Sequence, residues 1–306
     1  MSSLAAGALQ VGGVALAPLL PGSVQSMKAR LQGRRGASPL QPYRDLRRLW
    51  RKSTVDPIGT GVVYRTAPAV AAAAMLVAFA LVPVAGRSGD WSLGNDALVL
   101  VGLLALARFA LAAAAWDTGN GFALMGAARD LTLAVFGEAL LALTLLLAAL
   151  PAGSTDLTAM SAAAAGAGIW SEPAHWCGAL AIALVVLVET GRQPVDNPDT
   201  HLELTMIHEG PLLEYAGRDL AYLHWVAAAR HWLFLVLAAE LFLPHARGFA
   251  AGLAALAGGL VALCVALALT ETAQAKMRIL RVPPLLTLGS LVALAGVGSW
   301  IAGVAA

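Results

Sequence analysis

Eight apolar stretches constrain the fold of this chain most, because each is long enough to cross a bilayer as a helix. Hydrophobic residues make up 59% of the 306 residues and charged residues 12%, about half the usual share in a soluble domain. The sequence therefore predicts an all-α, polytopic membrane protein with about eight transmembrane helices, built as a single integral membrane domain over 1–306. The predicted spans are 3–20, 66–85, 97–116, 131–150, 173–190, 222–243, 250–270 and 284–303.

The basic residues predict how these helices are oriented. With the N-terminus outside, loops 21–65, 117–130, 191–221 and 271–283 are cytoplasmic and hold sixteen of the twenty Lys and Arg residues. The opposite loops hold only Arg87 and Arg247, in line with the bias of basic residues toward the cytoplasm. In the first loop, residues 43–52 have the spacing of a basic amphipathic helix at the cytoplasmic surface. Its charges serve either topology and lipid headgroups or a docking partner.

A strongly acidic stretch, residues 189–219, interrupts the apolar sequence and is called the acidic segment below. So many carboxylates cost free energy unless they are hydrated, paired or covered by a partner. Thr200 and Glu203 have capping-box spacing, which predicts a helix that carries Glu203 and Glu214 on one face unless Gly210-Pro211 interrupts it. The segment is either a solvated surface loop or a proton-handling or docking element. Its titratable and basic residues are Glu189, Arg192, Asp196, Asp199, His201, Glu203, His208, Glu209, Glu214, Arg218 and Asp219.

Several charged residues lie inside the predicted spans, although a charge at the bilayer centre costs at least about 2.5 kcal/mol. Arg108 and Glu138 form either a structural ion pair between neighbouring helices or part of a proton path. We expect His231 to be a core or interfacial histidine, and Glu240, near the outer end of its span, to be solvated. The remaining charges are Arg230 within a span and Glu189 and Glu271 at the cytoplasmic ends of spans.

The two cysteines, Cys177 and Cys264, stand alone in apolar surroundings without CxxC spacing. By themselves they do not supply a zinc or iron–sulfur ligand set. The sequence therefore predicts no metal bound by this chain and no catalytic residue set in it. No nucleic-acid-binding module is recognisable, since the basic residues follow the topology rule.

Four cytoplasmic segments carry a resemblance to a known family. The string GRQPVDNPDTHLELTMIHEGPLLEYAGRDLA resembles the membrane anchor subunit of formate hydrogenlyase and hydrogenase-4 type complexes, a family related to the quinone-chamber subunit of complex I. The segments ARLQ…RRG…LQP and LTETAQAKMRILRVPPLL resemble other cytoplasmic loops of the hydrogenase-type anchor. GNGFALMGAARDLTLAVFGEALLAL resembles a complex I helix in which a membrane-embedded glutamate belongs to the polar axis, and Glu138 takes that position. Gly210-Pro211 is a local departure, where helix-compatible residues are expected.

The resemblance implies a non-catalytic membrane subunit of a respiratory, hydrogenase-type oxidoreductase complex in the bacterial inner membrane, with loop 191–221 cytoplasmic. Its partners would be an iron–sulfur small subunit, a nickel–iron (NiFe) hydrogenase-like large subunit and antiporter-like membrane subunits. The iron–sulfur clusters and the NiFe centre would belong to those partners. The expected proton-path residues are Arg108, Glu138, Glu189, Arg192, Asp196, Asp199, His201, Glu203, His208, Glu209, Glu214 and Glu271. The expected docking residues are Arg34, Arg35, Arg47, Arg48, Arg51, Lys276, Arg278 and Arg281.

Two other functions stay open from the sequence. One is the quinone-chamber subunit of an NADH:quinone oxidoreductase, in which we expect an FDLPEAE-like sequence leading into the acidic segment. This chain has VDNPDTHLE there, which favours the hydrogenase branch. The other is a standalone proton or ion transporter, which intramembrane charges permit. No inverted-repeat halves or paired broken helices are recognisable in support of it.

Overall fold

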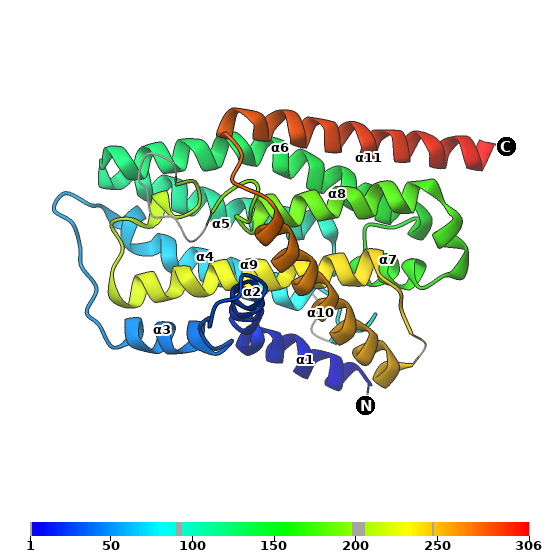
Figure 1. Cartoon of the computed structure of the whole chain (residues 1–306), viewed down its shortest axis with the longest axis horizontal. Helices are drawn as coiled ribbons and strands as arrows, with labels where there is room; N and C mark the ends of the chain where they lie inside the picture. Colours follow the sequence, from blue (N-terminus) through cyan, green and yellow to red (C-terminus); the bar gives the residue numbers. More distant parts are fainter. Residues whose placement is uncertain (1, 90–93, 198–205, 247, 306) are drawn as a thin grey trace.

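A computed structural model shows a bundle of long α-helices and describes residues 2–89, 94–197, 206–246 and 248–305 (Figure 1). Three short 3-10 turns accompany the helices: η1 (Ala167–Ser171), η2 (Gly210–Leu212) and η3 (Ile279–Arg281). The α-helices are α1 (Ser2–Leu16), α2 (Leu19–Leu31), α3 (Gln41–Trp50), α4 (Val62–Leu81), α5 (Ala97–Thr118), α6 (Gly121–Ala152), α7 (Leu157–Ala164), α8 (Pro173–Glu189), α9 (Gly217–Phe242), α10 (Phe249–Ala273) and α11 (Val282–Ala305).

The centre of the bundle is α9. In Figure 1, α4, α5, α6, α8, α9 and α11 run roughly parallel, and α10 crosses them obliquely. Of the most apolar 18-residue window of α9, 78% is buried, against 33% for α10 and 22% for the helix at Ile279–Val304. The helices α2, α3, α4, α8 and α10 all pack on α9. Charged residues on α9 therefore need partners inside the protein.

Six of the described helices are long and apolar enough to cross a membrane: α4, α5, α6, α9, α10 and the helix at Ile279–Val304. A seventh span exists if the bent pair α1 and α2 counts as one. The span predicted at 173–190 corresponds to α8, a shorter apolar helix of 17 residues. These helices confirm the all-helical membrane fold. That the chain has eight membrane spans stays a prediction.

The first predicted span differs from the structure in its path. Instead of one helix over 3–20, α1 ends at Leu16 and α2 continues to Leu31 after a bend of 53°. Pro18 accounts for the break, because it disfavours a helical conformation of the preceding residue and has no N–H to donate. The first part of the predicted loop 21–65 is consequently helical, and Lys28 is buried with 7% of its surface exposed.

The acidic segment is mostly irregular where the structure describes it. The interruption expected at Gly210-Pro211 is present, since residues 206–216 contain only the 3-10 turn η2 and no helix leads into Glu214. The turn η2 packs closely on α6, since a Cβ on Gly210 would lie 2.6 Å from the Cα atom of Gly126. Only glycine at both positions lets η2 press this closely on α6. The predicted capping-box residues Thr200 and Glu203 lie outside the described residues.

The amphipathic helix predicted at 43–52 is present as α3, from Gln41 to Trp50. Arg44, Arg47 and Arg48 are exposed, whereas Leu46 and Leu49 are half-buried. The Trp50 ring packs edge-on against Tyr222 of α9, with ring centroids 5.1 Å apart. This contact and the apolar face place α3 along the start of α9, at the same end of the bundle as the acidic segment (Figure 1).

Candidate functional site

Arg108 on α5 is the centre of a buried group of ion pairs. Its Nη1 donates to Oε1 of Glu138 on α6 over 2.7 Å, and its Nη2 donates to Oε2 of Glu189 at the end of α8 over 2.7 Å. Its Nε lies 3.5 Å from Oδ2 of Asp130 on α6. The Arg108 side chain is 3% exposed, so the three carboxylates replace water around it. The ion pair considered from the sequence is thus one arm of a four-residue cluster.

A second arginine, Arg230 on α9, joins this cluster. Its Nε lies 3.8 Å from Oε2 of Glu189, and its Nη2 donates to the carbonyl oxygen of Leu104 over 3.1 Å. Glu189 is 2% exposed and lies between the two guanidinium groups. Two arginines therefore face three carboxylates, and the third carboxylate, Asp130, also has a histidine beside it.

His208 connects this cluster to the acidic segment. Its Nε2 lies 3.7 Å from Oδ1 of Asp130, and its Nδ1 lies 3.4 Å from Oδ2 of Asp196. Lys276 Nζ donates to Oδ1 of Asp196 over 2.7 Å. Burial raises the pKa of Asp196, but the hydrogen bonds and charges of His208 and Lys276 outweigh it and hold the pKa well below its usual range. Gly191 makes room for the imidazole, since a Cβ there would lie 2.9 Å from Nδ1 of His208.

A third group of charges joins the bent helix pair to α10. Glu271 accepts from Nη1 of Arg192 over 3.0 Å through Oε1, and its Oε2 lies 3.1 Å from Nζ of Lys28. The Glu271 side chain is fully buried, and those of Arg192 and Lys28 are 6% and 9% exposed. Together with the Arg108 cluster and the His208 bridge, these residues are called the polar chain below.

Two cavities lie along the polar chain. The larger, of about 740 Å³, lies between α2, α3, α9 and the acidic segment, and its wall includes Arg192, Asp196, His208, His224 and His231. The smaller, of about 90 Å³, is lined by Arg108, Asp130, Glu189 and Arg230. Residues lining both are Thr190, His208, Leu212 and Ala227. Titratable groups thus run from an open cavity at the end of the bundle into the middle of the membrane helices.

The end of the acidic segment is held by aromatic and polar contacts. Tyr64 and Tyr215 stack with ring centroids 4.3 Å apart. The hydroxyl of Tyr64 donates to the carbonyl oxygen of Glu214 over 2.7 Å, and that of Tyr215 donates to the carbonyl oxygen of Tyr64 over 2.8 Å. The Glu214 carboxylate accepts from Asn120, which also caps α6. Glu214 is therefore positioned apart from the polar chain, and Glu209 lines the larger cavity.

Several expected site residues lie elsewhere. Asp199, His201 and Glu203 lie outside the described residues. Arg34, Arg35, Arg47, Arg48, Arg51, Arg278 and Arg281 are exposed, as docking residues need to be. Lys276, expected on the docking surface, instead binds Asp196 in the polar chain.

The sequence pattern pointed to no site role for three residues of the polar chain, Asp130, Arg230 and Lys28. Arg230 carried the signal of an intramembrane charge, whereas Asp130 and Lys28 lay in predicted loops.

The opposite end of the bundle is built differently. Glu240, expected to be solvated, is 1% exposed. Its carboxylate accepts from the backbone N–H groups of Ala85 and Gly86 over 2.7 and 2.9 Å and from Ser161 Oγ over 2.7 Å. The turn aims both N–H groups at the carboxylate because Ala85 and Gly86 have positive φ angles of 53° and 70°.

His231, in contrast, lies at the larger cavity beside the acidic segment. It is buried as expected, with 2% of its surface exposed.

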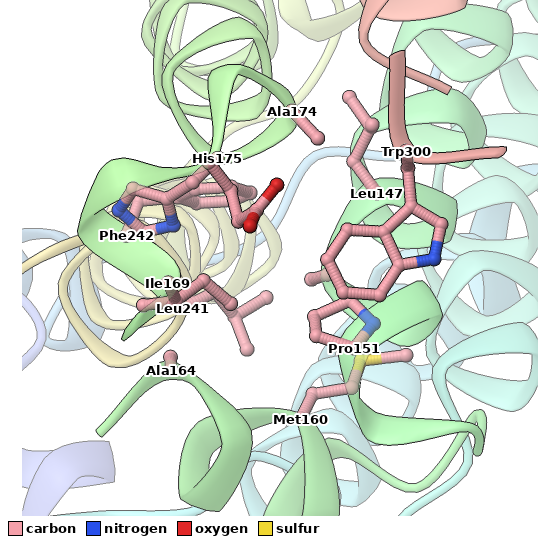
Figure 2. Close-up of a pocket in the computed structure, with 12 residues that line it drawn as sticks. Leu147, Pro151, Met160, Ala164, Ile169, Ala174, His175, Leu241, Phe242 and Trp300 are labelled. Atoms are coloured by element: carbon pink, nitrogen blue, oxygen red, sulfur yellow. The ribbon is translucent and has the colours of Figure 1, made fainter. Parts of the chain in front are cut away.

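Figure 2 shows a small pocket at this opposite end, with His175 on one side and Trp300 and Met160 on the other. Its volume is about 10 Å³, which is about the space of one water molecule. Leu147 and Pro151 of α6 lie on the same side as Trp300. This pocket beside Glu240 is therefore far smaller than the cavity of about 740 Å³ beside the acidic segment.

The fold and site define a multi-helix membrane protein whose helices carry a chain of paired, buried charges. The sequence model of the NADH dehydrogenase family matches residues 6–298, and the chain belongs to this family. It is 35% identical to "Hydrogenase-4 component C" of Escherichia coli K12 over 94% of this chain and 92% of that protein. It is 33% identical to "Formate hydrogenlyase subunit 4" of the same strain, over 87% and 88% of the two chains.

Two further comparisons agree in outline. The chain is 31% identical to one subunit of the NADH-quinone oxidoreductase of Cereibacter sphaeroides, over 69% of this chain and 66% of that protein. A chain in the structure of an archaeal membrane-bound sulfane sulfur reductase, a respiratory membrane complex, has the same fold. Its TM-score is 0.81 at 20% identity, with 94% of this chain and 95% of that chain covered. The family resemblance deduced from the acidic segment is confirmed by these matches.

Proposed function

We propose that this chain is the membrane subunit of a respiratory, hydrogenase-type complex, and that it couples redox chemistry in a docked module to proton movement through the polar chain. Its relatives of 35% and 33% identity, named for hydrogenase-4 and formate hydrogenlyase, support the type of complex. The single observation that carries the coupling role is the unbroken series Asp196–His208–Asp130–Arg108–Glu138, which starts at the larger cavity.

The chemistry of the series suits proton transfer. His208 bridges two carboxylates, so a proton taken up at Nδ1 allows the proton at Nε2 to leave toward Asp130. When Asp130 is neutral, Arg108 loses one of its three negative partners and binds Glu138 and Glu189 more strongly. Arg108 stays protonated throughout, so it does not carry the proton but links the charge of Asp130 to that of Glu138. The two arginines thereby set which carboxylates are held as anions.

The docked module in this proposal consists of an iron–sulfur small subunit and a NiFe hydrogenase-like large subunit, and antiporter-like subunits lie beside the chain in the bilayer. The module binds the cytoplasmic end, where α3 and the acidic segment lie together. Support comes from Arg44, Arg47 and Arg48, which are exposed on α3, since a charged patch fixes the register of a large partner. The loop 191–221 is cytoplasmic in this arrangement, in the bacterial inner membrane, with both termini outside.

The coupling role is tested with Glu138→Gln in the purified complex reconstituted into liposomes. Glutamine keeps the size and a hydrogen-bond acceptor but cannot carry the proton. We expect the complex to assemble and the protons moved per redox turnover to fall. The matched control is Glu172→Gln, a carboxylate beside the small pocket at the opposite end, which should leave both quantities unchanged. Normal proton movement in Glu138→Gln would refute the coupling role.

A quinone-chamber function is the second candidate, and the larger cavity favours it. Prolines and leucines form much of its wall, while Arg192 and His231 each have a buried nitrogen without a hydrogen-bond partner in the described residues. A polar headgroup on an apolar tail fits such a wall. If the purified complex contains flavin, oxidises NADH and reduces a short-chain quinone, this function is correct and the hydrogenase type is not.

A further inference from the structure

An open groove of about 440 Å³ lies at the start of α11, at the end of the bundle that holds the acidic segment. Leu184 and Leu187 of α8 line it on one helix, and Leu285 of α11 lines it on another. Met277, in the connection between α10 and α11, lies in its wall as well. The groove shares no lining residue with the two cavities along the polar chain, so it is a separate site.

The groove follows the apolar surfaces of α8 and α11. Leu184 packs directly on α11, because a Cβ on Gly289 would lie 2.7 Å from Cδ1 of Leu184. Leu288, one helical turn after Leu285, is 59% exposed. In Figure 1, α11 lies along the edge of the bundle, and only 22% of the most apolar window of its helix is buried. A hydrocarbon chain therefore has an apolar path that begins at Leu285 and runs along the membrane helices.

Two arginines lie where this path begins. Arg278 follows Met277 in the chain, and Arg281 lies one helical turn before Leu285. The N–H group of Arg281 donates to the carbonyl oxygen of Arg278 over 2.8 Å, and a turn of this kind brings its first and fourth Cα atoms within about 7 Å. Both side chains are exposed and have no ion-pair partner in the described part of the chain. Two guanidinium groups can therefore bind one phosphate.

The surroundings of the two arginines fit the level of lipid headgroups. Two carboxylates beside this connection, Asp196 and Glu271, already have partners and do not neutralise the arginines. Leu280, which lies between the arginines in sequence, is 85% exposed. The α10 helix ends at Ala273 and α11 begins at Val282, so the turn lies at the ends of two membrane helices. Basic residues at this level attract anionic lipid, and exposed leucines pack against acyl chains.

We propose that this groove binds an anionic phospholipid. The phosphate pairs with Arg278 and Arg281, and one acyl chain lies along α8 and α11. A zwitterionic lipid would bring its own cation next to two arginines, so the anionic headgroup is favoured. The N–H group of Met277 donates to the carbonyl oxygen of Pro194 over 2.8 Å, and a bound lipid therefore also fixes the acidic segment to the start of α11. The site is independent of the coupling role.

Thermal unfolding of the full chain in dodecyl maltoside tests the headgroup contact. Added dioleoylphosphatidylglycerol should raise the melting temperature, whereas dioleoylphosphatidylcholine and glycerol 3-phosphate should have little effect. Replacing both arginines, Arg278→Gln with Arg281→Gln, should raise the lipid concentration at half-effect by about 25-fold, since each basic residue contributes about fivefold toward anionic lipid. Equal stabilisation by phosphatidylcholine or by glycerol 3-phosphate would overturn the proposal.

The matched control is Arg34→Gln with Arg35→Gln, which removes the same charge from two exposed arginines outside the groove. It should keep the half-effect concentration of the unchanged chain. The melting temperatures without lipid show that both double variants fold. Equal half-effect concentrations in the two double variants would contradict a phosphate site at Arg278 and Arg281.

Photo-crosslinking in native membranes identifies what covers the groove. Leu288 is replaced by p-benzoylphenylalanine in the full chain, and the attached molecules are identified by mass spectrometry. We expect phospholipid with a higher anionic fraction than the membrane as a whole, and Arg278→Gln with Arg281→Gln should return this fraction to the membrane average. A crosslink to another subunit or to a second copy of this chain, or lipid at the membrane average in the unchanged chain, would overturn the proposal.

Discussion

The two ends of the bundle bury carboxylates by different means. At the end with the acidic segment, Glu189 and Asp130 are held by side-chain cations beside cavities of about 740 and 90 Å³. At the opposite end, Glu240 is held by two backbone N–H groups and a serine, with Nε2 of His245 3.5 Å away, and the neighbouring pocket is about 10 Å³. Backbone donors have fixed positions, whereas arginine and histidine side chains can exchange partners or protons. The first arrangement connects several such side chains in series from a cavity into the bundle, which suits proton transfer.

The largest expected effect comes from Arg108→Met. Removing the cation leaves Glu138, Glu189 and Asp130 without their shared partner, and breaking a buried ion pair costs about 3–5 kcal/mol. We expect much less folded chain in the membrane, measured by thermal inactivation and by the amount extracted intact. The control is Arg87→Met at the opposite end, where the guanidinium lies 5.6 Å from the Phe249 ring centre and contributes about 0.5–1 kcal/mol. Equal losses in both variants would contradict the difference between the ends.

Glu240→Leu should be the next largest in effect. It leaves the N–H groups of Ala85 and Gly86 without an acceptor, at about 1–3 kcal/mol for each buried unsatisfied group. We expect a lower melting temperature but an unchanged number of protons moved per turnover in the complex that assembles. Proton uptake by liposomes, normalised to redox turnover, measures this. A specific loss of coupling would show that this end takes part in proton movement.

Gly210→Ala tests the packing of the acidic segment. The added methyl group would lie 2.6 Å from the Gly126 Cα atom, and overpacking of this kind costs about 1–3 kcal/mol. Because His208 lies two residues before Gly210, we expect lower coupling as well as lower stability. Gly168→Ala is the matched control, since nothing lies within 4 Å of a Cβ there. Similar melting temperatures for the two variants would exclude a tight η2–α6 contact.

The smallest expected effect is a change in acid stability in Lys276→Met. The lowered pKa of Asp196 means that its ion pairs stabilise the folded state above its unfolded pKa of about 3.9. This stabilisation, about 1 kcal/mol for the Lys276 pair, is lost as the pH falls below that value. Lys276→Met should therefore be less stable at pH 7 and lose less between pH 5 and 3. Arg278→Met, exposed nearby, should follow the unchanged protein, and a parallel acid profile for Lys276→Met would disprove the pairing.

Long apolar stretches made the helical membrane fold predictable, because the bilayer requires internally hydrogen-bonded helices of a minimum length. The amphipathic helix at 43–52 was predictable from the spacing of its apolar and basic residues, and it is found at Gln41–Trp50. The bend at Pro18 and the continuation into α2 were missed, since a proline near the end of an apolar stretch indicates a helix end as readily as a bend. Lys28 was placed in a loop because nothing local shows that α2 turns it inward.

The sequence by itself determined that Arg108, Arg230, Glu138 and Glu189 had to be buried or paired, because a lone charge in a membrane helix is costly. It could not determine the pairing. Arg108 lies 81 residues from Glu189, and Lys28 and Glu271 come from opposite parts of the chain. Such partners meet only when α2, α5, α8 and α10 pack around α9, since ion-pair distances are set by helix packing and not by spacing along the chain. The tertiary structure also decided that Glu240 is buried, because only the turn at 84–87 brings two N–H groups to it.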